Sequence, residues 1–347
     1  MKIAQIAPLY ESVPPKFYGG TERIVSYLTE ELVRQGHEVT LFSSGDSVTK
    51  AELISPVKKS LRLDSSCIDR NALHFVMMEE VAKKAQDFDI IHYHIDYLHF
   101  PISRRENYFH LTTLHGRLDI PELKPLFNEY SEIPVVSISF EQRKPLQHAN
   151  WVGNVYHGIP STLYQLHNSS SNYLAFLGRI SPEKRVDRAI EIALRAGVPI
   201  KIAAKVDKVD LEYYQSIIKP MLKHPLVEFI GEIGEREKEE FLGNALALIF
   251  PIDWPEPFGL VMIEAMACGT PVIAFPNGSV PEVIDDKLTG YLINNIQEGI
   301  KAVETVSNYS RKKIREIFEK KFTVERMADH YVSIYREILS NLIMDVA

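Results

Sequence analysis

Short apolar segments alternate with amphipathic segments along most of the chain, and this alternation restricts the fold more than any other feature. Lys2–Ala7 is an apolar run of strand length, and Glu22–Gln35 places Ile24 and Leu28 on one face at helical spacing. Gly36 ends that helical pattern, and the next apolar run follows directly. Strand–helix–strand alternation predicts parallel sheets joined by right-handed crossovers.

The alternation occurs twice. The further strands predicted in the first series are Val39–Ser43, Ile90–Tyr93, Phe109–Leu114, Val135–Ser139 and Trp151–Tyr156. A polar break at His167–Asn172 follows. The strands predicted after it are Tyr173–Leu177, Ile200–Lys205, Val227–Ile230, Leu246–Pro251, Val272–Phe275 and Gly290–Ile293. Two doubly wound α/β domains are therefore expected, at about 1–160 and 170–323, with ligands bound outside the carboxyl ends of their strands.

Length and composition agree with a two-domain globular protein. The chain has 347 residues, of which 45% are hydrophobic and 24% are charged. The formal net charge of -7 argues against a general attraction to nucleic acid or to an anionic membrane. Two cysteines, Cys67 and Cys268, fit a reducing compartment. No signal peptide and no apolar window of about 20 residues is found, so a cytoplasmic protein without a transmembrane segment is expected.

The segment Trp254–Ala274 carries the strongest sign of chemistry. It holds two carboxylates, Glu256 and Glu264, eight positions apart, and a Pro-Phe-Gly-Leu turn joins the first to a helix that carries the second. The turn places backbone N–H groups at a helix start, where an anion or a sugar oxygen can be held. This arrangement suits a ligand with a sugar at one end and a ribose at the other.

The segment resembles the E-x7-E signature of retaining glycosyltransferases of the GT-B architecture, in particular glycosyltransferase family 4 (group 1). The resemblance implies two Rossmann-like doubly wound domains that face a central cleft, with the donor bound by the second domain. In that family the first Glu bonds the donor sugar and the second bonds the nucleotide ribose. Carried over, Glu256 would hold the sugar and Glu264 the ribose. The residues between them that would line the donor are Pro257, Phe258, Gly259 and Leu260.

The opening of the second domain resembles the G-R-x-x-x-x-K element of the same family. A strand is predicted to end at Gly178 and a helix to begin near Pro182, with Arg179 and Lys184 on either side. A guanidinium and an ammonium at a helix start can hold a diphosphate, and the resemblance assigns them that role. Arg185 is the competitor for it and is interpreted as a surface residue.

Two further positions in the second domain are candidates. Lys205, at a strand end, would add a third positive charge or would simply be solvated. The segment around Ile233 would contact the base through its backbone, by its position in the family.

Candidate residues in the first domain lie after two of its strands. Gly19 and Gly20, within Tyr18–Glu22, let the backbone approach a ligand, and the family has a Gly-Gly loop here that faces the donor phosphates. His115 resembles the histidine that contacts the donor sugar, without being an obvious nucleophile. Asp119 would help to orient the acceptor.

One pattern indicates a different class of protein. His92, His94 and Asp96 have H-x-H-x-D spacing, which on a strand would place all three on one face and allow them to ligate Zn²⁺. A metal-dependent hydrolase is therefore one alternative. The simpler interpretation is that these are polar residues at the end of a strand and bind no metal.

The function expected from the resemblance is transfer of a hexose from a nucleoside diphosphate sugar, first UDP-glucose, to the hydroxyl of a sugar or of a lipid-linked sugar, without a metal cofactor. A nucleotide-sugar epimerase of the same fold and a catalytically silent binding subunit are further alternatives. The loops Glu11–Phe17 and Ser47–Asn71 are expected to shape the acceptor site. Peripheral membrane contact is left open by the basic residues Lys16, Lys58, Lys59 and Arg62. For the last helix, at about 324–347, periodicity leaves open which domain it packs on, whereas the family pattern has it cross back to the first.

Overall fold

A computed structural model describes residues 1–16 and 19–345, with side chains up to residue 340. Phe17, at the end of the predicted acceptor loop, Tyr18, at the start of the predicted glycine motif, and residues 346–347 of the predicted last helix lie outside the described residues. The chain forms two compact units: unit 1 combines residues 1–160 with the segment from Val324 onward, and unit 2 comprises Ser161–Thr323.

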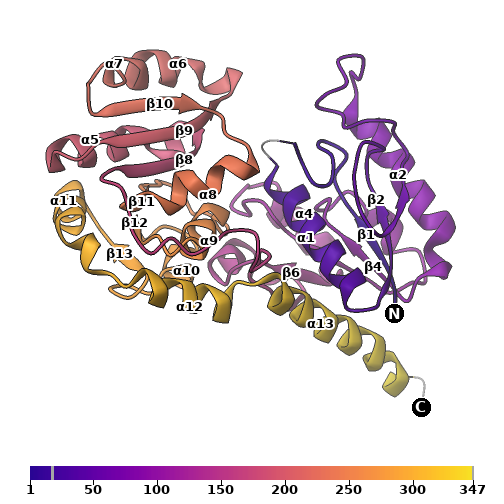
Figure 1. The fold of residues 1–347 in the computed structure, drawn as a ribbon. Helices are drawn as coiled ribbons and strands as arrows, with labels where there is room; N and C mark the ends of the chain where they lie inside the picture. Colours follow the sequence, from indigo (N-terminus) through magenta and orange to yellow (C-terminus); the bar gives the residue numbers. More distant parts are fainter. Residues whose placement is uncertain (17–18, 346–347) are drawn as a thin grey trace. The chain divides into compact units, whose positions relative to one another are not determined.

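Unit 1 is built on a parallel sheet of seven strands, in the order β3-β2-β1-β4-β5-β6-β7 (Figure 1). The strands are β1 (Lys2–Ile6), β2 (Glu38–Phe42), β3 (Glu52–Ile54), β4 (Ile90–Tyr93), β5 (His110–Thr113), β6 (Val135–Ser137) and β7 (Trp151–Asn154). The central strands are continuous apolar runs because helices cover both faces of a parallel sheet. Two apolar clusters, one around Ile6, Phe42 and Ile91 and one around Phe100 and Phe127, form much of its core.

The helices of unit 1 are α1 (Gly20–Arg34), α2 (Arg70–Lys84), α3 (Phe100–Ser103), α4 (Leu123–Glu129) and the last helix, α13 (Val324–Asp345). The segment expected to be the loop Ser47–Asn71 contains β3, and α2 begins at its end. Neither element was predicted, because the apolar periodicity of both segments is weak. The structure resolves the choice that periodicity leaves open for the last helix: α13 packs in unit 1, beside α1, with Tyr331 and Tyr335 fully buried.

Unit 2 repeats the same plan with six parallel strands, in the order β10-β9-β8-β11-β12-β13. The strands are β8 (Leu174–Ile180), β9 (Ile200–Val206), β10 (Val227–Gly231), β11 (Ala247–Phe250), β12 (Val272–Ala274) and β13 (Gly290–Leu292). The helices are α5 (Val186–Ala196), α6 (Leu211–Tyr213), α7 (Lys219–Met221), α8 (Glu235–Gly243), α9 (Leu260–Ala267), α10 (Val280–Val283), α11 (Ile296–Thr305) and α12 (Arg311–Lys321). Both sheets thus have the doubly wound α/β topology predicted from the alternation.

The strand order reverses at one place in each sheet. In unit 1 the reversal lies between β1 and β4, and in unit 2 between β8 and β11. Segments that follow the two strands at such a point diverge to opposite faces and leave a crevice at the carboxyl edge, where ligands bind. In unit 2 the segments that leave this point are those after Ile180 and after Phe250.

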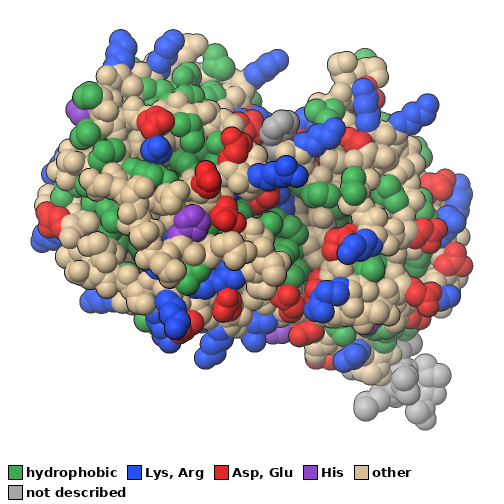
Figure 2. Space-filling model, in the orientation of Figure 1, with side chains coloured by type: hydrophobic (Ala, Val, Ile, Leu, Met, Phe, Trp, Pro, Cys, Tyr) green, Lys and Arg blue, Asp and Glu red, His purple; other side chains and the backbone are tan. Residues whose placement is uncertain are grey.

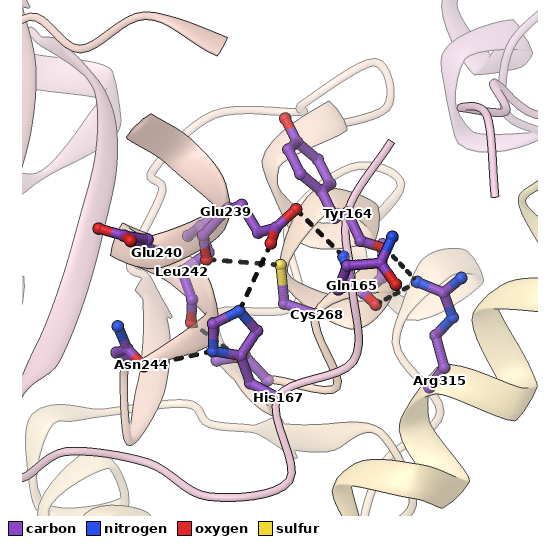
Figure 3. Close-up of polar contacts among 12 residues, drawn as sticks. Tyr164, Gln165, His167, Glu239, Glu240, Leu242, Asn244, Cys268 and Arg315 are labelled. Carbon is purple, nitrogen blue, oxygen red and sulfur yellow. Dashed lines mark hydrogen bonds and ion pairs between the residues drawn. The ribbon is translucent and has the colours of Figure 1, made fainter. Parts of the chain in front are cut away.

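The segment that opens unit 2 is tied to the helices α8, α9 and α12 (Figure 3). The Arg315 guanidinium donates to the backbone carbonyls of Tyr164 (2.7 Å) and Ala267 (2.6 Å). The Gln165 N–H donates to Glu239 (3.2 Å), and His167 lies between Glu239 and Asn244. Through Ala267, its last residue, the helix that carries Glu264 is therefore tied to α12.

Figure 2 shows acidic and basic side chains interspersed over the face that it displays, in agreement with the small net charge. Within the described part of the chain, no helix combines the length and the apolar character that crossing a membrane requires.

Candidate active site

The turn after β11 is shaped by one glycine and held in place by another. Gly259, with φ +81°, adopts the left-handed conformation from which α9 begins at Leu260. Gly278, with φ +62°, packs so closely that a Cβ there would lie 2.2 Å from the Glu256 nitrogen. Its neighbour Ser279 donates from its N–H to the Glu256 carbonyl (2.9 Å) and from Oγ to the Phe258 carbonyl (2.8 Å). The segment 277–279 thus determines where Glu256 lies, and the Asn-Gly pair in it is the sequence signal that the sequence analysis overlooked.

Glu256 is held by two side chains. Its Oε2 forms an ion pair with Lys184 Nζ and accepts a hydrogen bond from Trp254 Nε1 (2.8 Å). The Lys184 ammonium also lies 5.1 Å from the centroid of the Trp254 ring and 5.7 Å from that of Phe250. Two residues predicted separately, one after β8 and one after β11, therefore meet at the reversal point of the sheet.

Glu264 lies in α9 and is 3% exposed. Its Oε1 accepts from Lys238 Nζ at 2.8 Å, and the same ammonium lies 3.5 Å from Glu235 Oε2. Lys238 was missed by the sequence analysis. No local pattern marks it, because its partner Glu264 lies 26 positions further along the chain.

The structure corrects the local prediction around Arg179. Strand β8 continues to Ile180, so Gly178 and Arg179 lie inside the strand rather than beyond its end. A short 3-10 turn spans Pro182–Lys184, and α5 begins only at Val186. The predicted helix start near Pro182 is therefore wrong: Pro182 opens the 3-10 turn instead.

Arg185 is the reason for the late helix start. It has φ +53° and breaks the run between the 3-10 turn and α5, and its guanidinium pairs with Asp187 (2.7 Å) and Asp253 (2.8 Å). Its partners are Asp187 in the first turn of α5 and Asp253 in the loop after β11, and neither is a residue predicted to bind the donor.

Arg179 and Lys205 are brought together, and acidic side chains surround them. They are paired positions of β8 and β9, and Asp207 lies 3.0 Å from Lys205 Nζ and 3.9 Å from Arg179 Nη1. Arg179 also pairs with Glu183 and lies 3.5 Å from Asp210, whose pKa is raised chiefly by burial. A bound diphosphate would have to compete with these carboxylates for the guanidinium.

The loop around Ile233 lies between β10 and α8. Ile233 is half-buried, and the adjacent Gly234 N–H donates to the Glu237 carboxylate (2.8 Å) at the start of α8.

The glycine pair in unit 1 has a packing role of its own. Gly20 is the first residue of α1, and a Cβ at Gly19 would lie 2.8 Å from the Pro15 Cβ. Within the first turn of α1, Glu22 is 6% exposed, and burial raises its pKa. Glu22 was not among the predicted site residues, because an acidic residue is common in the first turn of a helix.

His115 follows β5 in unit 1. Its Nε2 lies 2.9 Å from His94 Nδ1, and its ring stacks on that of His157 with centroids 5.3 Å apart. Burial lowers the pKa of His115 to about 3, so the ring is neutral at physiological pH. Asp119, further along the same loop, pairs with Arg117 (2.7 Å).

The zinc interpretation of His92, His94 and Asp96 is wrong about their geometry. β4 ends at Tyr93, and Asp96 has φ +51°, so it does not continue the alternation of the strand. Both nitrogens of His92 are engaged, by Tyr335 Oη and Thr113 Oγ1 (2.7 Å each), and both nitrogens of His94, by His115 and Gln5. Among the side chains of residues 1–16 and 19–340, no three His, Cys, Asp or Glu residues are grouped so that they could hold a metal ion.

Comparison with known proteins identifies the family. The model described as "Glycosyl transferases group 1" matches residues 164–321, and the model described as "Glycosyltransferase Family 4" matches residues 18–175. An uncharacterized glycosyltransferase of Methanocaldococcus jannaschii is 23% identical over 97% of this chain and 98% of its own. The O-antigen chain mannosyltransferase C of Escherichia coli is 22% identical over 97% of this chain and 99% of its own.

A solved structure shares the fold. The structure of Anabaena HepE in complex with UDP-glucose superposes with a TM-score of 0.69 at 18% identity, covering 99% of this chain and 100% of that one. The two family models together span both doubly wound units and every residue described above from Gly19 to Ser279. The chain therefore belongs to the group 1, or family 4, glycosyltransferases and has their GT-B fold.

Proposed function

We propose that this glycosyltransferase transfers a hexose from a nucleoside diphosphate sugar, UDP-glucose in the first instance, to an acceptor hydroxyl with retention of the anomeric configuration. The observation that carries the proposal is the arrangement around α9. Two carboxylates flank the start of this helix, and each is paired with a lysine from another element of unit 2. Similarity to a protein solved with UDP-glucose supports the choice of donor.

In this mechanism Glu256 holds sugar hydroxyls and Glu264 holds the ribose, which the buried position of Glu264 suits because a buried carboxylate forms strong hydrogen bonds. Lys184, Arg179 and the N–H groups at the start of α9 stabilise the diphosphate as negative charge develops on it. The ion pair between Lys184 and Glu256 then exchanges: the ammonium turns to phosphate and the carboxylate to sugar.

The bond between the anomeric carbon and the phosphate oxygen breaks while the acceptor oxygen bonds to the same face of that carbon. The acceptor proton passes to the departing phosphate oxygen, so the proposal needs no protein nucleophile. We further propose that the cationic side chains, and not a divalent ion, neutralise the phosphate charge. Asp119 remains our proposal for orienting the acceptor, and the segment around Ile233 for contacting the base.

The experiment is thermal unfolding of the full chain with UDP-, GDP- and ADP-sugars, each with and without EDTA. A ligand that binds only the folded state raises Tm by mass action. The proposal expects a rise with UDP-glucose that EDTA leaves unchanged, followed by transfer that gives the α-linked product. A selective rise with GDP-mannose would contradict the donor, EDTA sensitivity would contradict metal independence, and a β-linked product would contradict retention.

A further inference from the structure

A continuous chain of hydrogen bonds runs through the core of unit 1 and ends at His115. Tyr331 Oη bonds Thr113 Oγ1 (2.9 Å), and Thr113 Oγ1 bonds His92 Nε2 (2.7 Å). His92 Nδ1 then bonds Tyr335 Oη (2.7 Å), which accepts from the Gln5 amide nitrogen (3.2 Å). On the other side of Gln5, its Oε1 bonds His94 Nε2 (2.8 Å). From Tyr331 to His94, every member of the chain is at most 2% exposed.

The Gln5 amide gives this chain a direction. Its nitrogen donates to Tyr335, so its oxygen faces His94, and an amide oxygen only accepts. His94 must therefore carry its proton on Nε2. Burial, together with the neighbouring His92, His115 and His157, holds the pKa of His94 well below its usual value, so the ring has only that proton.

The direction continues to His115. Because His94 Nδ1 is unprotonated, it is an acceptor, and the 2.9 Å contact with His115 Nε2 requires His115 to donate. His115 thus carries its proton on Nε2 and has a lone pair on Nδ1. If the Gln5 amide were reversed, every bond of the chain would run the other way and His115 would present an N–H at Nδ1 instead.

His115 Nδ1 is the unsatisfied end of the chain. The atom is buried, and among the described residues it has no hydrogen-bond partner. A buried acceptor without a donor is unfavourable, because nearly all buried polar groups in folded proteins have a hydrogen-bond partner. The partner that completes the chain must be a donor.

We propose that Gln5 and His94 are positioning residues that hold His115 in the Nε2–H tautomer, so that His115 Nδ1 accepts a hydrogen bond from a hydroxyl of the donor sugar. The sugar is the partner that follows from the proposed function, on which this part of the inference rests. Nδ1 is shielded from solvent in the unliganded protein, so donor binding must also uncover it. The tautomer itself is a property of the free protein.

The first test is therefore nitrogen NMR of the full chain with 15N-labelled histidine, without any ligand. Multiple-bond spectra distinguish Nε2–H, Nδ1–H and doubly protonated rings, and the variant His115→Gln identifies the His115 signals. The expected result is the Nε2–H form in the wild-type protein. An Nδ1–H or doubly protonated ring would overturn the inference, whatever the protein transfers.

Two tyrosines on α13 provide a matched pair of variants. Tyr335→Phe removes the hydroxyl that orients the Gln5 amide, whereas Tyr331→Phe removes an equally buried hydroxyl at the far end of the chain. The inference expects Tyr335→Phe to give a mixture of His115 tautomers and Tyr331→Phe to leave the Nε2–H form unchanged. Equal shifts in both variants would show general loosening of the core and would overturn the role of Gln5.

The second test uses the donor. In monodeoxy and monofluoro analogues of UDP-glucose, the fluorine can accept a hydrogen bond but cannot donate one. When the replaced hydroxyl is the one that contacts His115 Nδ1, kcat/KM should be lower by about tenfold or more for both analogues than for UDP-glucose. In His115→Ala this difference between the analogues and UDP-glucose should disappear. The inference would be overturned if, at every position where the deoxy analogue fails as a donor, the fluoro analogue were still transferred. No binding of any sugar nucleotide would instead refute the proposed function, with the NMR result still standing.

Discussion

Lys184 and Glu256, 72 positions apart in the chain, form an ion pair at the place where the order of the second sheet reverses. The two groups proposed to bind opposite ends of the scissile bond thus neutralise each other in the free protein. Donor binding must separate them, so substitution of either residue should change the affinity for the nucleotide.

The first prediction separates the two roles. Glu256→Gln frees the ammonium, so the affinity for sugar-free UDP should rise, by up to about tenfold, while transfer from UDP-glucose falls at least 100-fold. Lys184→Met should weaken UDP binding by about 10- to 100-fold. Calorimetric titration and initial rates measure both quantities.

The control for this prediction is Lys201→Met, which breaks another Lys–Glu pair of unit 2, at 3.3 Å from Glu228. Near-native transfer by either site variant would contradict the assignment of Glu256 and Lys184.

A second prediction concerns Trp254, whose Nε1 donates to Glu256 Oε2. Trp254→Phe keeps most of the ring and removes the donor, so the carboxylate is held by Lys184 alone. We expect kcat to fall by about tenfold, with a smaller change in UDP affinity, since the hydrogen bond orients the sugar-binding group. The other tryptophan provides the control, because Trp151 Nε1 donates to the Leu146 carbonyl in unit 1. Equal losses in Trp151→Phe would argue against a specific role.

A third prediction follows from two glycines with nearly the same positive φ. A Cβ added at Gly197 (φ +67°) would meet no heavy atom of the surrounding described residues within 4 Å, whereas at Gly278 (φ +62°) it would lie 2.2 Å from the Glu256 nitrogen. Gly197→Ala should therefore lower the free energy of unfolding by only about 1 kcal/mol, the cost of placing alanine in the left-handed conformation. Gly278→Ala should lose more stability and also transfer activity, because Glu256 must move. Denaturant unfolding and initial rates compare the two, and a Gly278→Ala protein with native activity would refute this account of the turn.

A fourth prediction is acid instability that originates in unit 1. Burial is the main cause of lowered pKa values in His92, His94, His99, His115 and His157. These rings are neutral when folded and take up protons on unfolding below about pH 6.5, so stability is present above that pH and is lost as the pH falls. Each such ring contributes about 1.4 kcal/mol per pH unit in this range.

Calorimetry in buffers of different ionisation enthalpy counts the protons taken up on unfolding at pH 5.5. His99→Gln should reduce the uptake by about one proton, and His148→Gln, which removes an exposed histidine, is the control. An uptake that does not change in His99→Gln would show that this histidine is not held neutral by the fold.

The doubly wound architecture was predictable because apolar strands such as Lys2–Ile6 and Ala247–Phe250 are buried on both faces and are therefore continuous runs in the sequence. The identity of Glu256, Glu264 and Lys184 as candidates was also predictable, since those residues lie in or near a dense motif. The contacts that these three residues make were not predictable. Lys238 reaches Glu264 from α8, 26 positions away, and nothing local marks that pairing.

The two errors have a common physical origin. The predicted helix at Pro182 and the predicted zinc strand at His92–Asp96 both assumed that a regular element continues through a residue that in fact has positive φ, Arg185 in one case and Asp96 in the other. Residues other than glycine adopt that backbone conformation rarely, and in Arg185 it is accompanied by a local contact with Asp187 and a tertiary contact with Asp253.

The hydrogen-bonded core of unit 1 has a consequence for biosynthesis. Tyr331 and Tyr335 belong to the last helix, whereas their partners Gln5, His92 and Thr113 are translated long before. On the ribosome, residues 1–160 have all of their strands but lack α13 until synthesis is nearly complete, whereas the contiguous segment Ser161–Thr323 contains the whole of unit 2 and can fold first. The order of maturation in this enzyme should thus be the reverse of the order of synthesis, and nascent chains stalled before residue 324 should expose the first unit, but not the second, to proteases and chaperones.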